Sequence, residues 1–168
     1  SGTVLYDLST SANNMNMYNS PSYFTENGGV LSFNGTNTYL QSISNAPITG
    51  ASPRTVCIWY KPTTNTDGTG SLFWTGNSGA ANSTFGIGLS SGNYQFWGNN
   101  NDVTDITLTP SINAWNFIAT TYNGNGTVKL FANGKFENAS LTLNTNVTKI
   151  DLMLNTLNLH VLNNIVCC

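Results

Sequence analysis

The run from Tyr94 to Asp102, YQFWGNNND, contains the types of side chain that sugar recognition needs. An aromatic face packs on the C–H groups of a sugar, while amide and carboxylate groups bond its hydroxyls. In an alternating strand, Trp97 lies on the face opposite Tyr94 and Phe96, so we expect it to face solvent beside the Asn-rich loop. We therefore predict a set of ligand contacts made of Trp97, Gln95, Asn99, Asn100 and Asp102.

The same aromatic residues also fit a purely structural role. Large aromatic side chains are mostly packing residues, so Trp97 is also consistent with closing the end of a β-sandwich beside a loop that is only polar. Trp74, which precedes Gly76 and Asn77, is a second candidate ligand contact with the same alternative. Trp59 and Trp115 are expected in the core.

Oxygen ligands for calcium are present in the same Asn-rich segment, namely Asp102, Asp105 and Asn101. Calcium takes six or more hard oxygen ligands, which carboxylate and amide groups supply. The segment is therefore a candidate calcium site that would support the ligand loop, although its two carboxylates supply only part of such a ligand set, and no other cofactor is expected.

The acidic residues do not form a catalytic pattern. Glycoside hydrolysis needs two carboxylates that flank one bond, which on a strand requires alternate positions such as Glu-x-Asp-x-Glu. No such pattern occurs, and Asp102 and Asp105 are three residues apart. The single histidine, His160, has no neighbouring acid in the sequence, so neither a Ser-His-Asp triad nor a histidine metal cluster is expected. We therefore expect no enzymatic activity.

Short alternating segments between Gly and Asn turns must position these residues. Trp115–Tyr122 and Thr127–Ala132 flank Asn123–Gly126, as in consecutive antiparallel strands. No segment shows sustained helical periodicity. The chain therefore predicts an all-β, two-sheet antiparallel β-sandwich that forms a single domain over residues 1–168. The other expected strands are Val4–Tyr6, Val30–Phe33, Thr38–Gln41, Arg54–Tyr60, Ser71–Trp74, Thr84–Leu89, Tyr94–Trp97, Asp105–Leu108, Ile150–Leu154 and Leu159–Val166.

Charged residues are scarce, at 7% of the chain, against about 25% in a typical domain. The five basic residues are dispersed, whereas phosphate binding needs clustered cations, so nucleic acid is not an expected partner. No apolar run reaches the roughly 20 residues of a membrane span, so membrane insertion is not expected. A surface of Asn, Ser, Thr and Gly is typical of extracellular or particle-surface β proteins, although an AT-rich genome produces the same composition. The chain opens with Ser-Gly-Thr-Val, so we expect a processed chain or one domain of a longer protein.

Strand-and-turn motifs recur in order through much of the chain. They include Asp7-Leu8-Ser9, Gly29–Gly35 (GVLSFNG), Thr55–Pro62 (TVCIWYKP) and the hairpin within residues 111–134. This ordered set, over residues 4–145, resembles the laminin-G-like domains of the concanavalin A-like lectin family. The resemblance implies a jelly roll of two antiparallel sheets. Such a domain is typically one module of a larger adhesive, glycan-binding or structural protein.

The tail departs from this family. The family closes with a Gly-x-Ile/Leu-Asp-x-Val-x-Ile-Tyr strand beside the N-terminal strand, whereas residues 157–168 read LNLHVLNNIVCC. Either the closing strand has diverged or the chain is truncated. Truncation would leave a sheet edge with unpaired backbone groups, which a neighbouring chain could fill.

The sequence therefore favours a non-enzymatic, lectin-like adhesion module that binds glycans on a cell or virus-particle surface. The alternative is a structural or assembly module of a capsid, fibre or extracellular matrix, whose partners are neighbouring protein chains. Low charge and the unusual tail favour the alternative, whereas an aromatic residue beside an Asn-rich loop favours the lectin.

Overall fold

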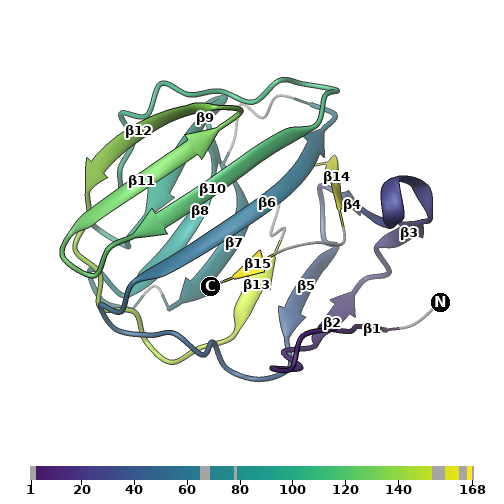
Figure 1. Ribbon diagram of the computed structural model, residues 1–168, viewed down its shortest axis with the longest axis horizontal. Helices are drawn as coiled ribbons and strands as arrows, with labels where there is room; N and C mark the ends of the chain where they lie inside the picture. The colour runs from purple at the N-terminus through teal and green to yellow at the C-terminus, as the bar shows by residue number, and fades with distance from the viewer. Residues whose placement is uncertain (1–2, 65–68, 78, 153–157, 163–165, 168) are drawn as a thin grey trace.

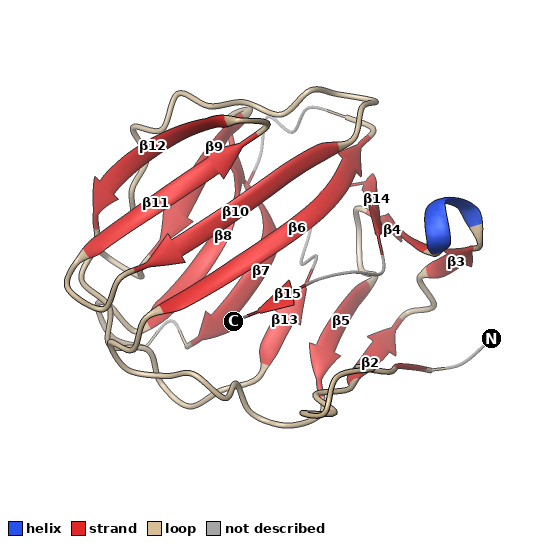
Figure 2. Ribbon diagram, viewed as in Figure 1, coloured by secondary structure: helices blue, strands red, loops and turns tan. Residues whose placement is uncertain are grey.

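The chain forms two antiparallel β-sheets that pack face to face (Figure 1). The computed structural model describes residues 3–64, 69–77, 79–152, 158–162 and 166–167. Within these ranges the only helical element is a short 3-10 turn at Glu26–Gly28 (Figure 2), and no helix is long and apolar enough to span a membrane. The predicted all-β, two-sheet sandwich is confirmed.

The seven-stranded layer, which we call sheet A, has the strand order β1-β2-β5-β13-β7-β8-β9. All neighbouring strands in it are antiparallel. Its strands are β1 (Val4–Leu5), β2 (Met15–Tyr18), β5 (Tyr39–Ser42), β13 (Ile150–Leu152), β7 (Thr69–Gly76), β8 (Thr84–Ser90) and β9 (Asn93–Trp97).

The eight-stranded layer, sheet B, has the order β12-β11-β10-β6-β14-β4-β3, and β15 also pairs with β6. Its strands are β3 (Ser22–Phe24), β4 (Val30–Asn34), β6 (Arg54–Pro62), β10 (Asn116–Tyr122), β11 (Thr127–Ala132), β12 (Lys135–Ser140), β14 (Asn158–Leu162) and β15 (Val166–Cys167).

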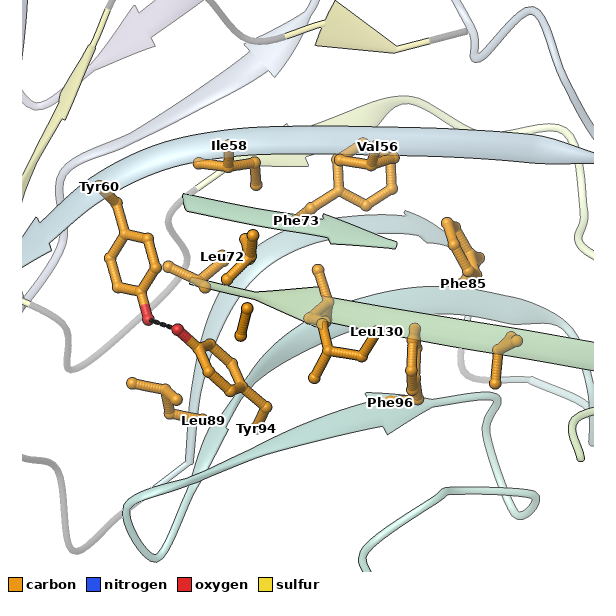
Figure 3. Packing of buried hydrophobic residues seen from close by; sticks show 14 of the residues in the cluster. Val56, Ile58, Tyr60, Leu72, Phe73, Phe85, Leu89, Tyr94, Phe96 and Leu130 are labelled. Atoms are coloured by element: carbon orange, nitrogen blue, oxygen red, sulfur yellow. Dashed lines mark hydrogen bonds between the residues drawn. The ribbon is translucent and has the colours of Figure 1, made fainter. Parts of the chain in front are cut away.

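Apolar side chains from both sheets fill the space between the layers, because each sheet buries one face of its alternating strands. Ile58 of sheet B and Ile87 of sheet A are at most 1% exposed. The hydroxyls of Tyr60 and Tyr94 bond each other across the layers at 2.7 Å (Figure 3). Burial raises the pKa of both phenols, that of Tyr94 to about 12, because a phenolate there would lose its hydration. This hydroxyl pair is therefore a polar link between the sheets within the core.

Arg54 is a buried cation that ties β6 to two loops. Its Nη1 donates to Thr145 Oγ1 at 2.8 Å, its Nη2 to the Gly50 carbonyl at 2.8 Å, and its Nε to the Ser52 carbonyl at 3.0 Å. The guanidinium carbon lies 5.5 Å from the centroid of the Phe85 ring. Burial lowers the pKa of Arg54, and the three hydrogen bonds offset its lost hydration.

Most predicted strands are present, but four segments differ from expectation. The strands β2, β3 and β12 were not predicted, because each is short or polar and β2 lies within a stretch that reads as polar. Residues 105–108, predicted as a strand, form none. Instead, the segment 103–108 lies along β9, where Val103 and Phe96 exchange backbone hydrogen bonds and Tyr94 N donates to the Leu108 carbonyl at 3.0 Å. This segment therefore covers the outer edge of sheet A.

The tail enters the interior of sheet B rather than lying at an edge. β14 pairs with β4 on one side and with β6 on the other. The described tail residues therefore fill the position between these strands. The predicted end of the preceding strand at Leu154 lies outside the described residues, as do 163–165 of the predicted closing strand.

Candidate functional site

A row of side chains crosses the outer face of sheet A. Residues that stand directly opposite one another on neighbouring strands share one face of a sheet. Their flanking residues, such as Leu40, Ile87 and Phe96, are buried in the core, so the row itself faces outward. We call this set the outer row: Asn16, Gln41, Asp151, Trp74, Gly86 and Trp97.

Two indoles lie on a glycine floor at one end of the outer row. The ring centroids of Trp74 and Trp97 are 6.0 Å apart. A Cβ at Gly86 would lie 2.7 Å from Trp74 Cε3, and a Cβ at Gly88 would lie 2.5 Å from Trp97 Cη2. Glycine at both positions therefore allows the rings to lie directly against β8.

The burial of Trp97 corrects the expectation that it faces solvent. Trp97 lies on the predicted outer face with Gln95, but it is only 8% exposed. The physical reason is the glycine floor, since no side chain of β8 holds the ring away from the sheet and Trp74 packs beside it. Trp97 is therefore a packing residue of the outer face, and its role as a ligand contact stays a prediction. Trp74 remains partly exposed and can present an aromatic surface to a ligand.

A hydrogen-bonded polar pair lies beside Trp74 in the outer row. Gln41 Nε2 donates to Asp151 Oδ1 at 2.9 Å, and both side chains are partly exposed. Burial raises the pKa of Asp151, while the hydrogen bond from Gln41 and the charge of Lys149 act in the opposite direction. The remaining oxygen and amide hydrogen of the pair can bond hydroxyl groups. Sequence reasoning missed this pair because its members are 110 residues apart and no local motif joins them.

In the Asn-rich loop after β9, two of the predicted contact residues, Asp102 and Asn99, form hydrogen bonds within the protein. Asp102 Oδ1 accepts the backbone N–H groups of Gly98 and Asn99 at 2.9 and 3.1 Å. Asn99 Nδ2 donates to the Ala80 carbonyl at 2.5 Å. Asn99 and Asn100 adopt positive φ, of 62° and 55°, which asparagine tolerates better than most residues. The loop therefore has a clear conformational role, and its role as a ligand contact stays a prediction.

A groove of about 710 Å³ brings together the two aspartates predicted to bind calcium. Asp102 and Asp105 lie on one side of it, opposite Asn138 and Ser140 of β12. Asn101, the third predicted ligand, instead donates its side-chain amide to the Thr142 carbonyl at 3.0 Å. Among the described residues, no three acidic, histidine or cysteine side chains gather closely enough to hold a metal ion. The calcium site stays a prediction.

Four aromatic side chains form a patch on the outer face of sheet B. We call Trp59, Phe117, Phe131 and Phe136 the aromatic patch. Trp59 is 42% exposed and Phe136 is 59% exposed. Ring centroids are 5.1 Å apart for Trp59 and Phe117, and 5.8 Å apart for Phe131 and Phe136. The expectation that Trp59 is a core residue is wrong, because Ile58 and Tyr60 take the inward positions of β6. Trp115, also expected in the core, is partly exposed.

The two antiparallel layers, packed face to face, define a jelly-roll β-sandwich. The chain belongs to the concanavalin A-like lectin/glucanase superfamily, because the family model of that superfamily matches residues 34–155. The expected family is confirmed. No curated protein matches the sequence.

Solved structures with a similar fold include several toxin binding domains. The binding domain of botulinum neurotoxin serotype G has a TM-score of 0.74 at 13% identity, covering 97% of this chain and 44% of that one. The binding domain of Paraclostridial Mosquitocidal Protein 1 has a TM-score of 0.72 at 19% identity, covering 94% and 44%. A structure of botulinum neurotoxin type C has a TM-score of 0.71 at 16% identity, covering 96% of this chain and 44% of that one. Cell entry of that neurotoxin depends on its interaction with two ganglioside molecules. The present chain thus spans less than half the length of each, and at these identities the likeness concerns the fold.

Proposed function

We propose that this chain is a carbohydrate-binding module without enzymatic activity and that it binds its ligand on the outer row of sheet A. The observation that carries this proposal is the direct register of Trp74 with the hydrogen-bonded pair of Asp151 and Gln41. A partly exposed indole offers a flat apolar surface to a sugar ring, and the adjacent amide and carboxylate offer hydroxyl partners. Membership of a superfamily that includes lectins, and the ganglioside dependence of the type C neurotoxin, support it.

The lack of a second carboxylate near Asp151 supports binding over hydrolysis. Glycoside hydrolysis requires two carboxyl groups that flank the scissile bond. Among the strands of sheet A, in the described residues, Asp151 is the single carboxylate. We therefore propose that Asp151 orients a bound sugar through a hydrogen bond, and that incubation with glucans releases no reducing ends.

We further propose that the module acts in adhesion on an extracellular or virion surface. The support is compositional, because Asn, Ser, Thr and Gly replace charged residues on its surface. Immunogold labelling of intact particles or cells with an antibody to the native fold tests this location. Labelling confined to the interior would contradict it.

The binding proposal is tested first on a glycan array, with the purified chain in calcium and in chelator. The affinity for the best glycan is then measured for Trp74→Ala and Gln41→Ala, with Trp59→Ala as the matched control on sheet B. We expect each sheet A variant to lose about tenfold or more in affinity, equivalent to about 1.4 kcal/mol, while Trp59→Ala binds as the wild type does. Unchanged binding by both sheet A variants, or no glycan bound by a folded sample, would overturn the proposal.

The aromatic patch favours a second candidate, a structural or assembly module. Exposed aromatic clusters mark protein interfaces, because their burial drives association. In that case the partner would be a neighbouring protein chain of a capsid, fibre or matrix. Sedimentation analysis of the wild type and of Phe136→Ser distinguishes the two functions. Self-association that Phe136→Ser abolishes would favour assembly, and a monomer at all concentrations would count against self-assembly.

A further inference from the structure

β12 is the longest sheet edge without a backbone partner in the described part of the chain. It has six residues in continuous register with β11 on one side only. The opposite edge strand of sheet B, β3, has three residues, and β1 of sheet A has two. The remaining edge, β9, is covered by the segment 103–108. Among the edge strands that the structure describes, β12 alone therefore offers a long row of unpaired hydrogen-bonding groups.

The hairpin that joins β11 and β12 determines which groups point outward. Asn133 and Gly134 both have positive φ, 48° and 83°, as a two-residue type I′ turn requires. At the other end of the hairpin, Leu141 N donates to the Gly126 carbonyl at 2.9 Å. Hydrogen-bonded and non-hydrogen-bonded pairs alternate along antiparallel strands. Counting from either end of the hairpin assigns the same residues of β12 to the pairs that are not hydrogen-bonded to β11. The residues that direct N–H and C=O to the free edge are Phe136, Asn138 and Ser140.

A groove lies directly against the open half of this edge. The cavity of about 710 Å³ is lined by Asn138 and Ser140 of β12 and by the segment 102–105 opposite. The Glu137 carboxylate accepts Thr107 N at 3.1 and 3.2 Å and Thr107 Oγ1 at 2.6 Å, and this closure joins β12 to the segment 103–108 next to the groove-lining Asn138. Phe136 lies beyond this closure. The open part thus exposes the edge groups of Asn138 and Ser140, enough to pair with about four residues of extended chain.

The wall opposite β12 is negatively charged. Asp102 and Asp105 are both exposed and line the groove, and neither forms an ion pair with a described side chain. In an extended peptide, alternate side chains project from the same face, so two basic residues spaced by one or three positions would reach this wall together. Acidic peptides would be repelled by the same carboxylates.

We propose that the free edge of β12 binds an extended basic peptide segment of a partner protein as an added strand. The backbone of the peptide bonds Asn138 and Ser140, and its lysine or arginine side chains pair with Asp102 and Asp105. Main-chain bonds supply affinity, while the two carboxylates select for positive charge. The edge of β12 belongs to sheet B, whereas the outer row belongs to sheet A, and the probes are peptides, so the test does not depend on carbohydrate binding.

Fluorescence anisotropy with a labelled peptide, in which lysine alternates with threonine and valine, tests the proposal. Two further probes are the same peptide with glutamate for lysine and the same peptide N-methylated at alternate backbone nitrogens. We expect the lysine peptide to bind, and the other two to bind at least about tenfold more weakly. Because these probes use the wild-type chain, the test does not depend on any variant folding.

Proline substitutions then locate the bound strand. Ser140→Pro removes an N–H that β11 does not use, and proline is tolerated at a sheet edge, so the fold should persist. Phe136→Pro removes an equivalent N–H beyond the Glu137–Thr107 closure and is the matched control. We expect Ser140→Pro to weaken lysine-peptide binding about tenfold, Phe136→Pro to leave it unchanged, and Asp105→Asn to reduce both affinity and salt dependence.

Three results would overturn the proposal. They are no binding of the lysine peptide, equal binding of the lysine and glutamate peptides, and binding unaffected by N-methylation. Equal loss of binding in Ser140→Pro and Phe136→Pro, with both variants folded, would also contradict the assigned position. Thermal unfolding of each variant establishes that it is folded.

Discussion

Replacing Trp97 with alanine should strongly destabilise the fold. A tryptophan side chain buries about 200 Å², and Trp97 is only 8% exposed. At roughly 25 cal/mol per Å² of apolar surface, its burial contributes about 4–5 kcal/mol. Large-to-small substitutions of buried aromatic residues cost about 3–5 kcal/mol, which agrees with this figure. A domain of this size has a free energy of unfolding of about 5–15 kcal/mol, so Trp97→Ala should lose a large part of it.

Urea denaturation followed by far-ultraviolet circular dichroism measures this loss. The urea concentration at the midpoint should fall, while the slope of the free energy of unfolding against urea concentration stays constant. This combination indicates a change in stability alone. Phe136→Ala is the control, because its ring is 59% exposed and the same arithmetic gives a loss below about 2 kcal/mol. If Trp97→Ala unfolds within about 1 kcal/mol of the wild type, the ring contributes little packing, and the structural role assigned to it is wrong.

Three further perturbations test the packing and hydrogen bonds that stabilise the fold. A Cβ in Gly88→Ala would lie 2.0 Å from the carbonyl oxygen of Gly70, so thermal unfolding should show a loss of about 1–3 kcal/mol, and an unchanged midpoint would refute the close approach. The folded-state pKa of Tyr94, about 12, exceeds its ordinary value of about 10, so the unfolded state ionises first and stability should fall as pH rises between about 10 and 12. Tyr94→Phe should reduce this dependence and cost about 1–2 kcal/mol at neutral pH, because the Tyr60 hydroxyl loses its partner; identical pH profiles would contradict this. Arg54→Met should lower the free energy of unfolding in urea by about 3 kcal/mol, because it leaves buried oxygen acceptors without their donor. A loss below about 1 kcal/mol would show that water replaces the guanidinium.

The sequence predicts the central strands well because alternation records which face is buried. In β6, Ile58 and Tyr60 are apolar inward residues, and the same is true of Ile118 in β10. Edge strands do not bury a complete face, so they carry weaker patterns. The sequence of β12, KFENAS, reads as a polar segment, although it pairs with β11 over its full length.

The candidate site was predictable only in part. Trp74 and Trp97 were singled out by residue type, and the structure places them side by side. The polar pair of Gln41 and Asp151 depends on β13 lying between β5 and β7, which is a long-range pairing that no local motif encodes. The burial of Trp97 likewise depends on the glycines of a different strand, whose absent side chains leave room for the ring.

The position of β14 has a consequence for the order in which the strands of sheet B pair during synthesis. Residues 158–162 lie between β4, at residues 30–34, and β6, at residues 54–62. The ribosome releases β4 and β6 long before β14, so the early hairpin of β3 and β4 has no attachment to the rest of sheet B until the tail emerges. Until then, the facing edges of β4 and β6 are open to solvent and to other nascent chains.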